Sequence, residues 1–299
     1  MLAVLAGLAS SMQGPTNTAL STHVGRAQAT LVSFAGGSIL LGVLVLLFGQ
    51  GDLTGVVRVP WWQLITGFYG FLVIVSVVYA TPRLGIAFTL MILMFGKLVT
   101  GACIDAFGLF TAAPKEITLL RVAGLCCVAL GIVLVSIGRM RASGASKPTA
   151  GGGVLLAGVL AAVAGAGNAI QAPTLAAFTS TVGSVEASLW NFLGGLACAI
   201  VYLLASQKGE WQPFRGAGTQ PWQYLGGVYG TIVVLIVIAA TPALGVGLLV
   251  SAQMCGQLTG GMIIDAHGWL GCRRIPVSAW RVSGIAAVAA GVIIISLFG

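Results

Sequence analysis

Ten apolar segments follow one another along the chain, each of about 17–25 residues, the length a helix needs to cross ~30 Å of hydrocarbon. They lie near residues 1–20, 28–49, 61–80, 84–104, 119–138, 153–175, 185–205, 222–240, 244–264 and 280–298. Only 7% of the residues are charged, whereas a soluble domain carries roughly 25%, so most of the surface must face lipid. Because lipid offers the backbone no hydrogen bonds, each segment has to be helical. We predict an all-α integral membrane protein with ten transmembrane helices.

The second half of the sequence repeats the first. Residues 63–131 align with residues 223–291 at a constant offset of 160, and 25 of these 69 positions are identical. Before residue 63 the offset is 158. Similarity in one register over such a length indicates duplication. Each copy holds five spans, an odd number, so we predict two inverted five-helix repeats related by a pseudo-two-fold axis in the membrane plane. The predicted repeats are residues 1–140 and 152–299, joined by a polar linker at 141–151.

The basic residues predict the orientation of the chain. Ten of the 14 Lys and Arg residues lie in one set of loops, the linker among them, and three lie on the opposite side. By the positive-inside rule we expect the linker in the cytoplasm and both termini outside. The net charge of +8 is thus assigned to topology and to membrane lipid headgroups, and nucleic acid is not expected as a partner.

Polar residues deep within spans are costly and usually functional. Four amides are of this kind: Gln13 and Asn17 in the first helix, and Asn168 and Gln171 in the sixth. Pro15 and Pro173 lie beside them and remove a backbone donor. Two broken, amide-lined helices at matched positions indicate a substrate-binding site near the midplane. The alternative is that the amides only hold helices together, with hydrogen bonds worth ~1 kcal/mol.

Lys97 is the one cation in the middle of a span, and its repeat equivalent is Gln257. Gln253 lies four residues before Gln257, on the same helix face. A lysine in hydrocarbon must find a partner, face a watery cavity or lose its proton. We predict that all three residues bind substrate, with Lys97 as the ligand of a carboxylate or as a titrating coupling group. The alternatives for Lys97 are a structural pair with Asp105 and snorkelling to an interface.

Two acid–arginine pairs recur in the two copies. Asp105 is followed sixteen residues later by Arg121, and Asp265 by Arg281. Because they lie near span ends, we interpret them as structural charge pairs at the membrane interface. Glu186, early in the seventh helix, is expected to act at a helix N-terminus; the alternative is a part in proton coupling.

Four further residues complete the candidate site. Asn191 is predicted to bind substrate beside Trp190, and Tyr69, Trp190 and Tyr229 are candidate cavity walls. For the two tyrosines the alternative is anchoring in the aromatic belt at the lipid interface. His23 is expected to be isolated and interfacial.

Sequence signatures of catalysis are missing from the chain. No nucleotide-binding or metal-ligand motif occurs, and the six cysteines fall mostly inside apolar segments without a CxxC pair. Such thiols behave as small buried hydrophobes. We therefore expect no catalytic residues, no cofactor, no metal site and no enzymatic activity.

Several short motifs resemble those of a known family. They are Gly96-Lys-Leu, Asp105-Ala-Phe-Gly108-Leu and Arg121-Val-Ala-Gly124 in the first copy, with Gly256-Gln-Leu and Asp265-Ala-His-Gly268 in the second. With these, the whole chain resembles the drug/metabolite transporter superfamily, and within it the branch of fused five-helix inner-membrane exporter domains of unknown function. The resemblance implies a bacterial inner-membrane carrier with a central cavity and alternating access. Small cation exporters of that superfamily use a glutamate in the first helix, where this chain has Gln13 and Asn17, so proton-coupled export of a bulky cation by that route is not expected.

The leading hypothesis is a secondary transporter, an exporter of a small polar or amphipathic metabolite, with a proton or sodium ion as the candidate coupling ion. One alternative is a passive channel or lipid scramblase. Another is a membrane assembly subunit that transports nothing.

Overall fold

The computed structural model describes residues 1–84, 86–110, 116, 118–143, 152–206, 218–272 and 274–298, and the regular structure in these ranges is all helical. The long helices are α1 (Leu2–Val24), α2 (Arg26–Phe48), α4 (Thr66–Leu84), α5 (Ile86–Phe107), α6 (Leu119–Ser143), α7 (Gly152–Val182), α8 (Ser184–Ser206), α9 (Gly226–Leu244), α10 (Val246–His267) and α11 (Ala279–Phe298). The short helices η1 (Leu53–Arg58) and α3 (Trp61–Leu64) precede α4, and η2 (Pro221–Leu225) precedes α9.

Eight of these helices are long and apolar enough to cross a membrane, namely α2 and α5 to α11. In α4 the described apolar stretch is shorter, Thr66–Val77. Helix α1 carries many hydroxyl and amide side chains, and it packs against α2, α9 and α10 rather than standing alone in lipid. The all-helical membrane fold is confirmed at this level, and the ninth and tenth spans stay a prediction.

The structure contradicts the expected helix breaks. Helices α1 and α7 run through Pro15 and Pro173 without interruption. A proline removes one N–H and crowds the preceding turn, but close packing by neighbouring helices holds a membrane helix together across it. Helix α9 also contains a proline, Pro242, and it continues to Leu244. It ends at Gly245, whose φ of 73° is readily adopted by glycine.

Helix α6 also extends further than expected, to Ser143, and so enters the predicted linker. Arginine, methionine and alanine are good helix formers, and two side chains hold this end in place. Arg139 pairs with Asp265, and Arg141 stacks over the Trp280 ring at 4.7 Å. The rest of the linker, residues 144–151, lies outside the described part of the chain.

Two long contacts join the halves, and each is the repeat equivalent of the other: α1 packs against α10, and α7 packs against α5. Glycine residues let the backbones of both helix pairs approach each other closely. A Cβ on Gly256 would collide with the carbonyl oxygen of Val4, and one on Gly96 would collide with that of Ala162. Small residues at helix crossings are the usual means by which membrane helices approach each other.

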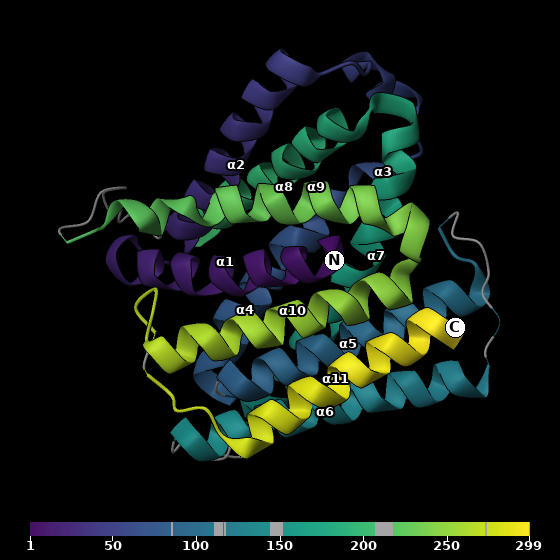
Figure 1. Cartoon of the computed structure of the whole chain (residues 1–299). Coiled ribbons are helices and arrows are strands. Elements are labelled where there is room, and N and C mark those ends of the chain that lie inside the picture. The colour runs from purple at the N-terminus through teal and green to yellow at the C-terminus, as the bar shows by residue number, and fades with distance from the viewer. Residues whose placement is uncertain are drawn as a thin grey trace.

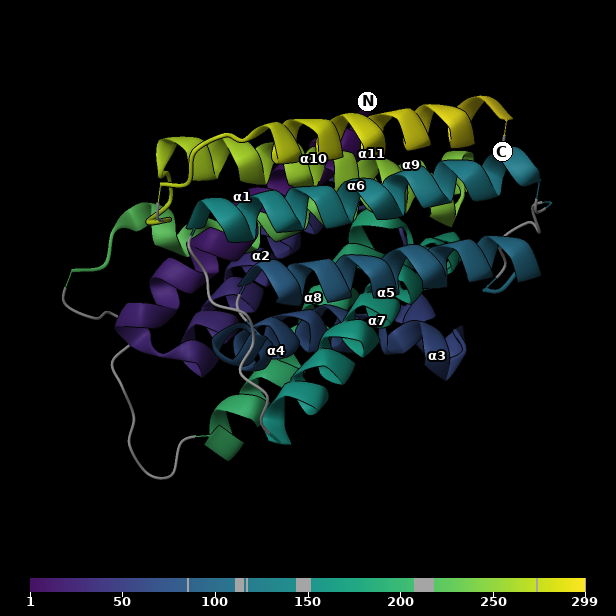
Figure 2. The ribbon, with the colours of Figure 1, turned by 90° about the horizontal axis from the view of Figure 1, so that it is seen from below.

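The equivalent helices α6 and α11 lie side by side at one edge of the bundle (Figures 1 and 2). A Cβ on Gly284 would lie 2.7 Å from the carbonyl oxygen of Gly131, and one on Gly291 would lie 2.5 Å from that of Gly124. The later residue of α6, Gly131, thus meets the earlier residue of α11, Gly284. The two helices are therefore antiparallel.

A second pair of equivalent helices, α2 and α8, lies together at the opposite edge (Figure 1). Phe34 covers Gly195, Phe192 covers Gly37, and the two rings meet edge to face with centroids 5.8 Å apart. These contacts too run in opposite directions along the two chains, so equivalent helices meet antiparallel at both edges of the bundle.

The largest buried apolar cluster joins α5, α6, α10 and α11. It includes Leu98 and Ile104 of α5, Val128 and Ile132 of α6, Met254 of α10 and Val288 of α11. Lipid tails are as apolar as these side chains, so close packing rather than the hydrophobic effect stabilises such a cluster. Next to it the packing opens into a cavity.

Candidate functional site

A cavity of about 790 Å³ lies inside the bundle, within the usual size range of ligand pockets. One wall is formed by α1 and α10, and the other by α5 and α6, with η2 and the segment after α10 at one end. Small and polar residues line its α1 wall: Ser10, Ser11, Gly14, Pro15 and Thr18. Elements of both repeats therefore line the cavity.

The mouth of this large cavity lies at one end of the bundle. His23 near the end of α1, Trp222 of η2 and Cys272 after α10 line it there. This is the end at which α6 finishes and α7 begins, so it is the side of the inter-repeat linker. His23, expected to be isolated, instead contributes to the cavity wall.

A second, small cavity of about 40 Å³ brings together four of the predicted substrate-binding residues. They are Lys97, Asn168, Gln171 and Gln253. The Lys97 ammonium donates a hydrogen bond to Oε1 of Gln253, and Lys97 is buried. The predicted alternative, pairing of Lys97 with Asp105, is not what forms, because the carboxylate of Asp105 bonds elsewhere.

The contact between Gln253 and Ser10 lies on the partition between the two cavities. Gln253 lines the small cavity and Ser10 the large one, and Gln253 Nε2 lies 3.5 Å from Ser10 Oγ. One turn further along α10, Gln257 lines the large cavity. Lys97 and Gln257, equivalent by the repeat, thus lie on opposite sides of this partition.

Gln171 is the centre of an amide network on α7. Its Nε2 donates to Oδ1 of Asn191 on α8 over 2.9 Å and to the carbonyl of Thr66 over 3.2 Å. Its Oε1 lies 3.4 Å from Nδ2 of Asn168. The network joins predicted site residues from two helices, and it also ties α7 to α4 and α8, so binding and packing roles coincide here.

Gln13 and Asn17 lie on the other face of α1. Gln13 Nε2 would be 2.7 Å from a Cβ on Gly230, and Asn17 Oδ1 would collide with a Cβ on Gly226. The two amides therefore fit over the glycines of α9, and the residues between them, Gly14 and Pro15, line the large cavity. The structure brings Gln13 and Asn17 to the α1–α9 contact rather than to the cavity wall.

The three predicted aromatic wall residues pack elsewhere than on the cavity walls. Trp190 packs against the buried cluster of Leu175 and Phe178, and Tyr69 contacts Phe68. Neither they nor Tyr229 belongs to the residues described as lining either cavity.

Asp105 closes the end of the bundle opposite the mouth. Its carboxylate accepts hydrogen bonds from Arg121 Nη2 over 2.5 Å and from the first two amides of α10, Val246 N over 2.9 Å and Gly247 N over 2.7 Å. A carboxylate at a helix N-terminus is stabilised by unpaired N–H groups and the helix dipole. The C-terminal end of α5 is thereby fixed to the N-terminus of α10. The predicted pair of Asp105 and Arg121 forms, and both residues are buried; its position at the membrane interface stays a prediction.

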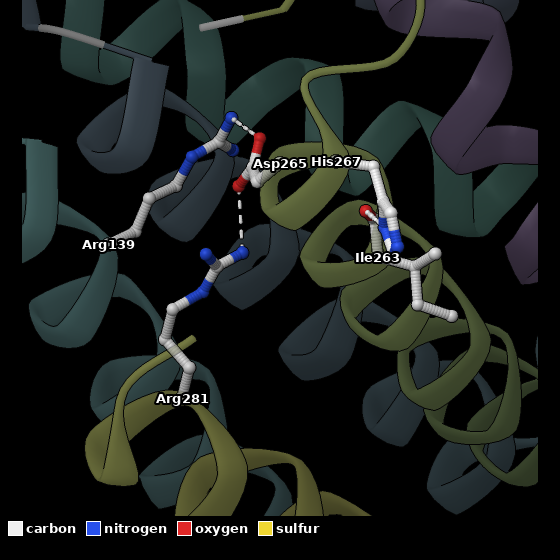
Figure 3. A network of polar contacts seen from close by, with 5 residues as sticks. All are labelled: Arg139, Ile263, Asp265, His267 and Arg281. Atoms are coloured by element: carbon white, nitrogen blue, oxygen red, sulfur yellow. Dashed lines mark hydrogen bonds and ion pairs between the residues drawn. The ribbon is translucent and has the colours of Figure 1, made fainter. Parts of the chain in front are cut away.

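Asp265, the repeat equivalent of Asp105, has different partners. Oδ2 accepts from Arg281 Nη2 over 2.7 Å and Oδ1 from Arg139 Nη2 over 3.0 Å. Figure 3 shows the carboxylate between the two guanidinium groups, with His267 turned back to the carbonyl of Ile263 on its own helix. All three charged residues line the large cavity.

A pair of equivalent glycines shows how the two ends differ. A Cβ on Gly101 of α5 would lie 3.5 Å from Val246 and 3.6 Å from Val250, both on α10. A Cβ on Gly261, 160 residues later on α10, would meet no described atom within 4 Å, and Gly261 lines the large cavity. Helices α5 and α10 are therefore in contact at the Asp105 end and separated by the cavity at the Asp265 end.

Sequence reasoning missed most residues of the cavity wall, and Arg139 and Trp222 matter most among them. Arg139 was counted among the residues that set topology, and Trp222 was not singled out. A signal for Arg139 was present: its repeat equivalent is Gly299, so the charge occurs in one copy alone.

Comparison with known proteins gave a family and a fold. The family model described as "Putative inner membrane exporter, YdcZ" matches residues 1–134 and again residues 156–294. Curated protein sequences gave no match. A solved crystal structure, described only as that of a protein, is similar over 99% of this chain and 96% of its own, with a TM-score of 0.71 and 16% sequence identity. At that identity the likeness concerns the fold alone.

Proposed function

We propose a transport function on the premise that this chain belongs to the YdcZ-type family of inner membrane exporters, whose model matches both of its halves. The protein is a secondary carrier that exports a small polar or amphipathic metabolite. It works by alternating access, with ten spans in two inverted five-helix repeats. The antiparallel contacts of α6 with α11 and of α2 with α8 support the inverted arrangement, because inversion turns each helix against its equivalent.

The main support for the proposal is that α5 and α10 touch at the Asp105 end of the bundle and are separated at the Asp265 end. The contact at Gly101 is closed, and the equivalent position Gly261 opens onto the cavity. In an inverted repeat the opposite state is obtained when the two halves exchange conformations. The closed contact would then form at Gly261, and the contact at Gly101 would open to the other side.

Asp105 and Asp265 are the proposed latches of these two states. Asp105 now holds the first amides of α10. In the opposite state Asp265 would accept from the equivalent amides at the start of α5, residues 86 and 87, and Asp105 would release α10. Each carboxylate keeps its own arginine throughout, because unpairing a buried charge costs several kcal/mol.

The orientation follows from the charge of the loops. The mouth of the large cavity lies on the side of the loops that hold ten of the 14 basic residues, which the positive-inside rule assigns to the cytoplasm. The state described here is therefore the one that faces inward, ready to take up substrate from the cytoplasm. Substrate leaves that cavity through the partition at Gln253, where Lys97 and the amides of α7 form the rest of the path, with a proton or sodium ion as the candidate coupling ion.

Counterflow in proteoliposomes tests the carrier mechanism. A metabolite library is first screened for compounds that raise the melting temperature of the purified protein, since a ligand selective for the folded state stabilises it. A carrier takes up a labelled hit faster into vesicles preloaded with the same unlabelled compound. A disulfide between Gly101→Cys and Val250→Cys should stop this exchange, and reduction should restore it. Conductance without counterflow would identify a channel, lipid flipping alone a scramblase, and no flux of any kind an assembly subunit.

A further inference from the structure

We propose that the large cavity binds an organic anion, a compound with one carboxylate or similar acidic group on a mostly apolar body, and that the acidic group is held by Arg139 and Arg281. The proposal rests on the proposed transport function for its purpose and names the substrate class. Its evidence is the charge, the unpaired donors and the walls of the cavity.

Positive charge exceeds negative charge on the cavity wall. Among the described residues that line it, the charged ones are Arg139, Arg281 and Asp265, two guanidinium groups for one carboxylate. The next ionisable group, across the partition in the small cavity, is Lys97, which adds no negative charge in either protonation state. Uncompensated charge is expensive away from bulk water, so this cavity is suited to a ligand that brings one negative charge.

The arginines have hydrogen-bond donors to spare. Asp265 uses one oxygen for each guanidinium group. This leaves Nε of Arg139 and both Nε and Nη1 of Arg281 buried without a protein partner. Arg281 is 1% exposed, so these donors have been taken out of bulk water. The three unpaired nitrogen atoms are themselves buried, so a ligand carboxylate reaches them once the guanidinium groups turn toward the cavity. Two planar guanidinium groups then match the geometry of a carboxylate, which accepts paired N–H bonds.

The equivalent position in the first repeat lacks the excess of positive charge, although Nη1 of Arg121 is also buried without a partner. There Asp105 pairs with the single guanidinium group of Arg121, and its carboxylate is further satisfied by two backbone amides. Arg139 has no charged counterpart, because its equivalent is Gly299. The extra cation is therefore not needed for the structural pair itself, and it occurs where the pair borders the large cavity.

The remaining walls indicate an apolar body for the ligand. Val77, Leu90, Met94 and Val135 line one side, and Trp222 lies near the mouth. Ligand pockets with apolar walls and a few placed polar groups orient amphipathic molecules with the polar head at the polar groups. The acidic group would thus reach Arg139 and Arg281 while the body lies along α5 and α6.

Three probes of one shape test the charge preference directly. They are 3-phenylpropionate, 3-phenylpropylamine and 3-phenylpropanol, measured by equilibrium dialysis against the purified full-length protein. The proposal predicts saturable binding of the propionate at least tenfold tighter than of the other two. Equal or tighter binding of the amine or the alcohol would overturn it, and so would the lack of saturable binding by all three.

Two matched variants locate the binding. Arg139→Gln should weaken propionate binding at least tenfold. Arg141→Gln removes the same charge two residues away, from a side chain that stacks on Trp280 instead, and should change it less than twofold. Equal effects of the two variants would place the anion elsewhere. If Arg139→Gln fails to elute as folded protein, the salt dependence of propionate binding to the unmodified protein replaces it, with added chloride expected to compete.

These measurements need no transport, so they separate the two proposals. Selective anion binding without counterflow would refute the carrier and keep the anion site. Counterflow of cationic or neutral compounds alone, without anion binding, would refute the anion site and keep the carrier.

Discussion

The substitution Asp105→Asn tests whether the carboxylate latches α5 to α10. The change keeps the shape of the side chain but removes its charge and replaces one acceptor oxygen with an NH₂ donor. Asp105 accepts three hydrogen bonds, one from Arg121 and two from the first amides of α10. Asparagine has one oxygen left to receive them, so at least one N–H group in a buried site loses its acceptor.

The expected loss of stability is large for a substitution that replaces one oxygen atom with an NH₂ group. A buried donor left unpaired costs about 1–3 kcal/mol, and the two remaining bonds lose about 1 kcal/mol each because their acceptor is no longer charged. Together these give about 3–5 kcal/mol. With about 2 °C of melting temperature per kcal/mol for a chain of this size, the apparent Tm should fall by about 6–10 °C.

Thermal unfolding of the purified protein in detergent, followed by tryptophan fluorescence, measures this shift. Asp52→Asn is the matched control, because Asp52 is a half-exposed loop carboxylate whose neutralisation should move the free energy of unfolding by less than about 0.5 kcal/mol. If the two variants have the same Tm, the three hydrogen bonds of Asp105 do not hold α5 to α10, and the latch is wrong.

Three further predictions concern other parts of the bundle. Lys97→Gln should leave the protein folded and change substrate affinity or the pH dependence of transport; identical transport at every pH would exclude a role for the ammonium group. Gly131→Ala should lower the Tm, because the new Cβ collides with a backbone carbonyl of α11, whereas Gly36→Ala, with no described atom within 4 Å, should raise it slightly through a better helix propensity of about 0.5–1 kcal/mol; a loss of stability in both would point to a cause other than this contact. Glu186→Gln should cost about 1 kcal/mol in thermal unfolding, since its bond of 2.8 Å to the Gly51 amide loses its charge; an unchanged Tm would make that bond unimportant.

Much of the fold could be predicted from the sequence. Hydropathy identifies the apolar segments, and the constant repeat offset relates the helices of the two halves. The helix bounds agree with the predicted segments to within a few residues at most ends. The exceptions are local: Pro15 and Pro173 predicted helix breaks, yet each lies inside a continuous helix that packs against neighbouring helices.

The candidate site was predictable in part. A buried cation and amides in spans are rare enough to identify Lys97, Asn168, Gln171 and Gln253, which meet around one small cavity. Their partners were not predictable, because the bond from Lys97 to Gln253 joins helices 156 residues apart.

The asymmetry of the molecule lies beyond sequence reasoning. Gly101 and Gly261 are identical in the repeat, yet one contact is closed and the other is open. A repeat specifies both states equally, and packing of the whole bundle selects one. Arg139 is a different case: its repeat equivalent, Gly299, carries no charge, but the structure was needed to place Arg139 on the cavity wall.

Cysteine cross-linking at the two equivalent contacts tests alternating access most directly. In a background without the native cysteines, Gly101→Cys pairs with Val250→Cys at the closed end, and Leu90→Cys pairs with Gly261→Cys across the large cavity. Alternating access predicts that the Gly101–Val250 disulfide forms readily in the resting protein. The Leu90–Gly261 disulfide should form only in molecules whose first pair has separated. Mass analysis of the protein with all four substitutions should therefore find one disulfide or the other. Both disulfides in the same molecule would contradict the exchange of states, as would a second pair that never cross-links under transport conditions.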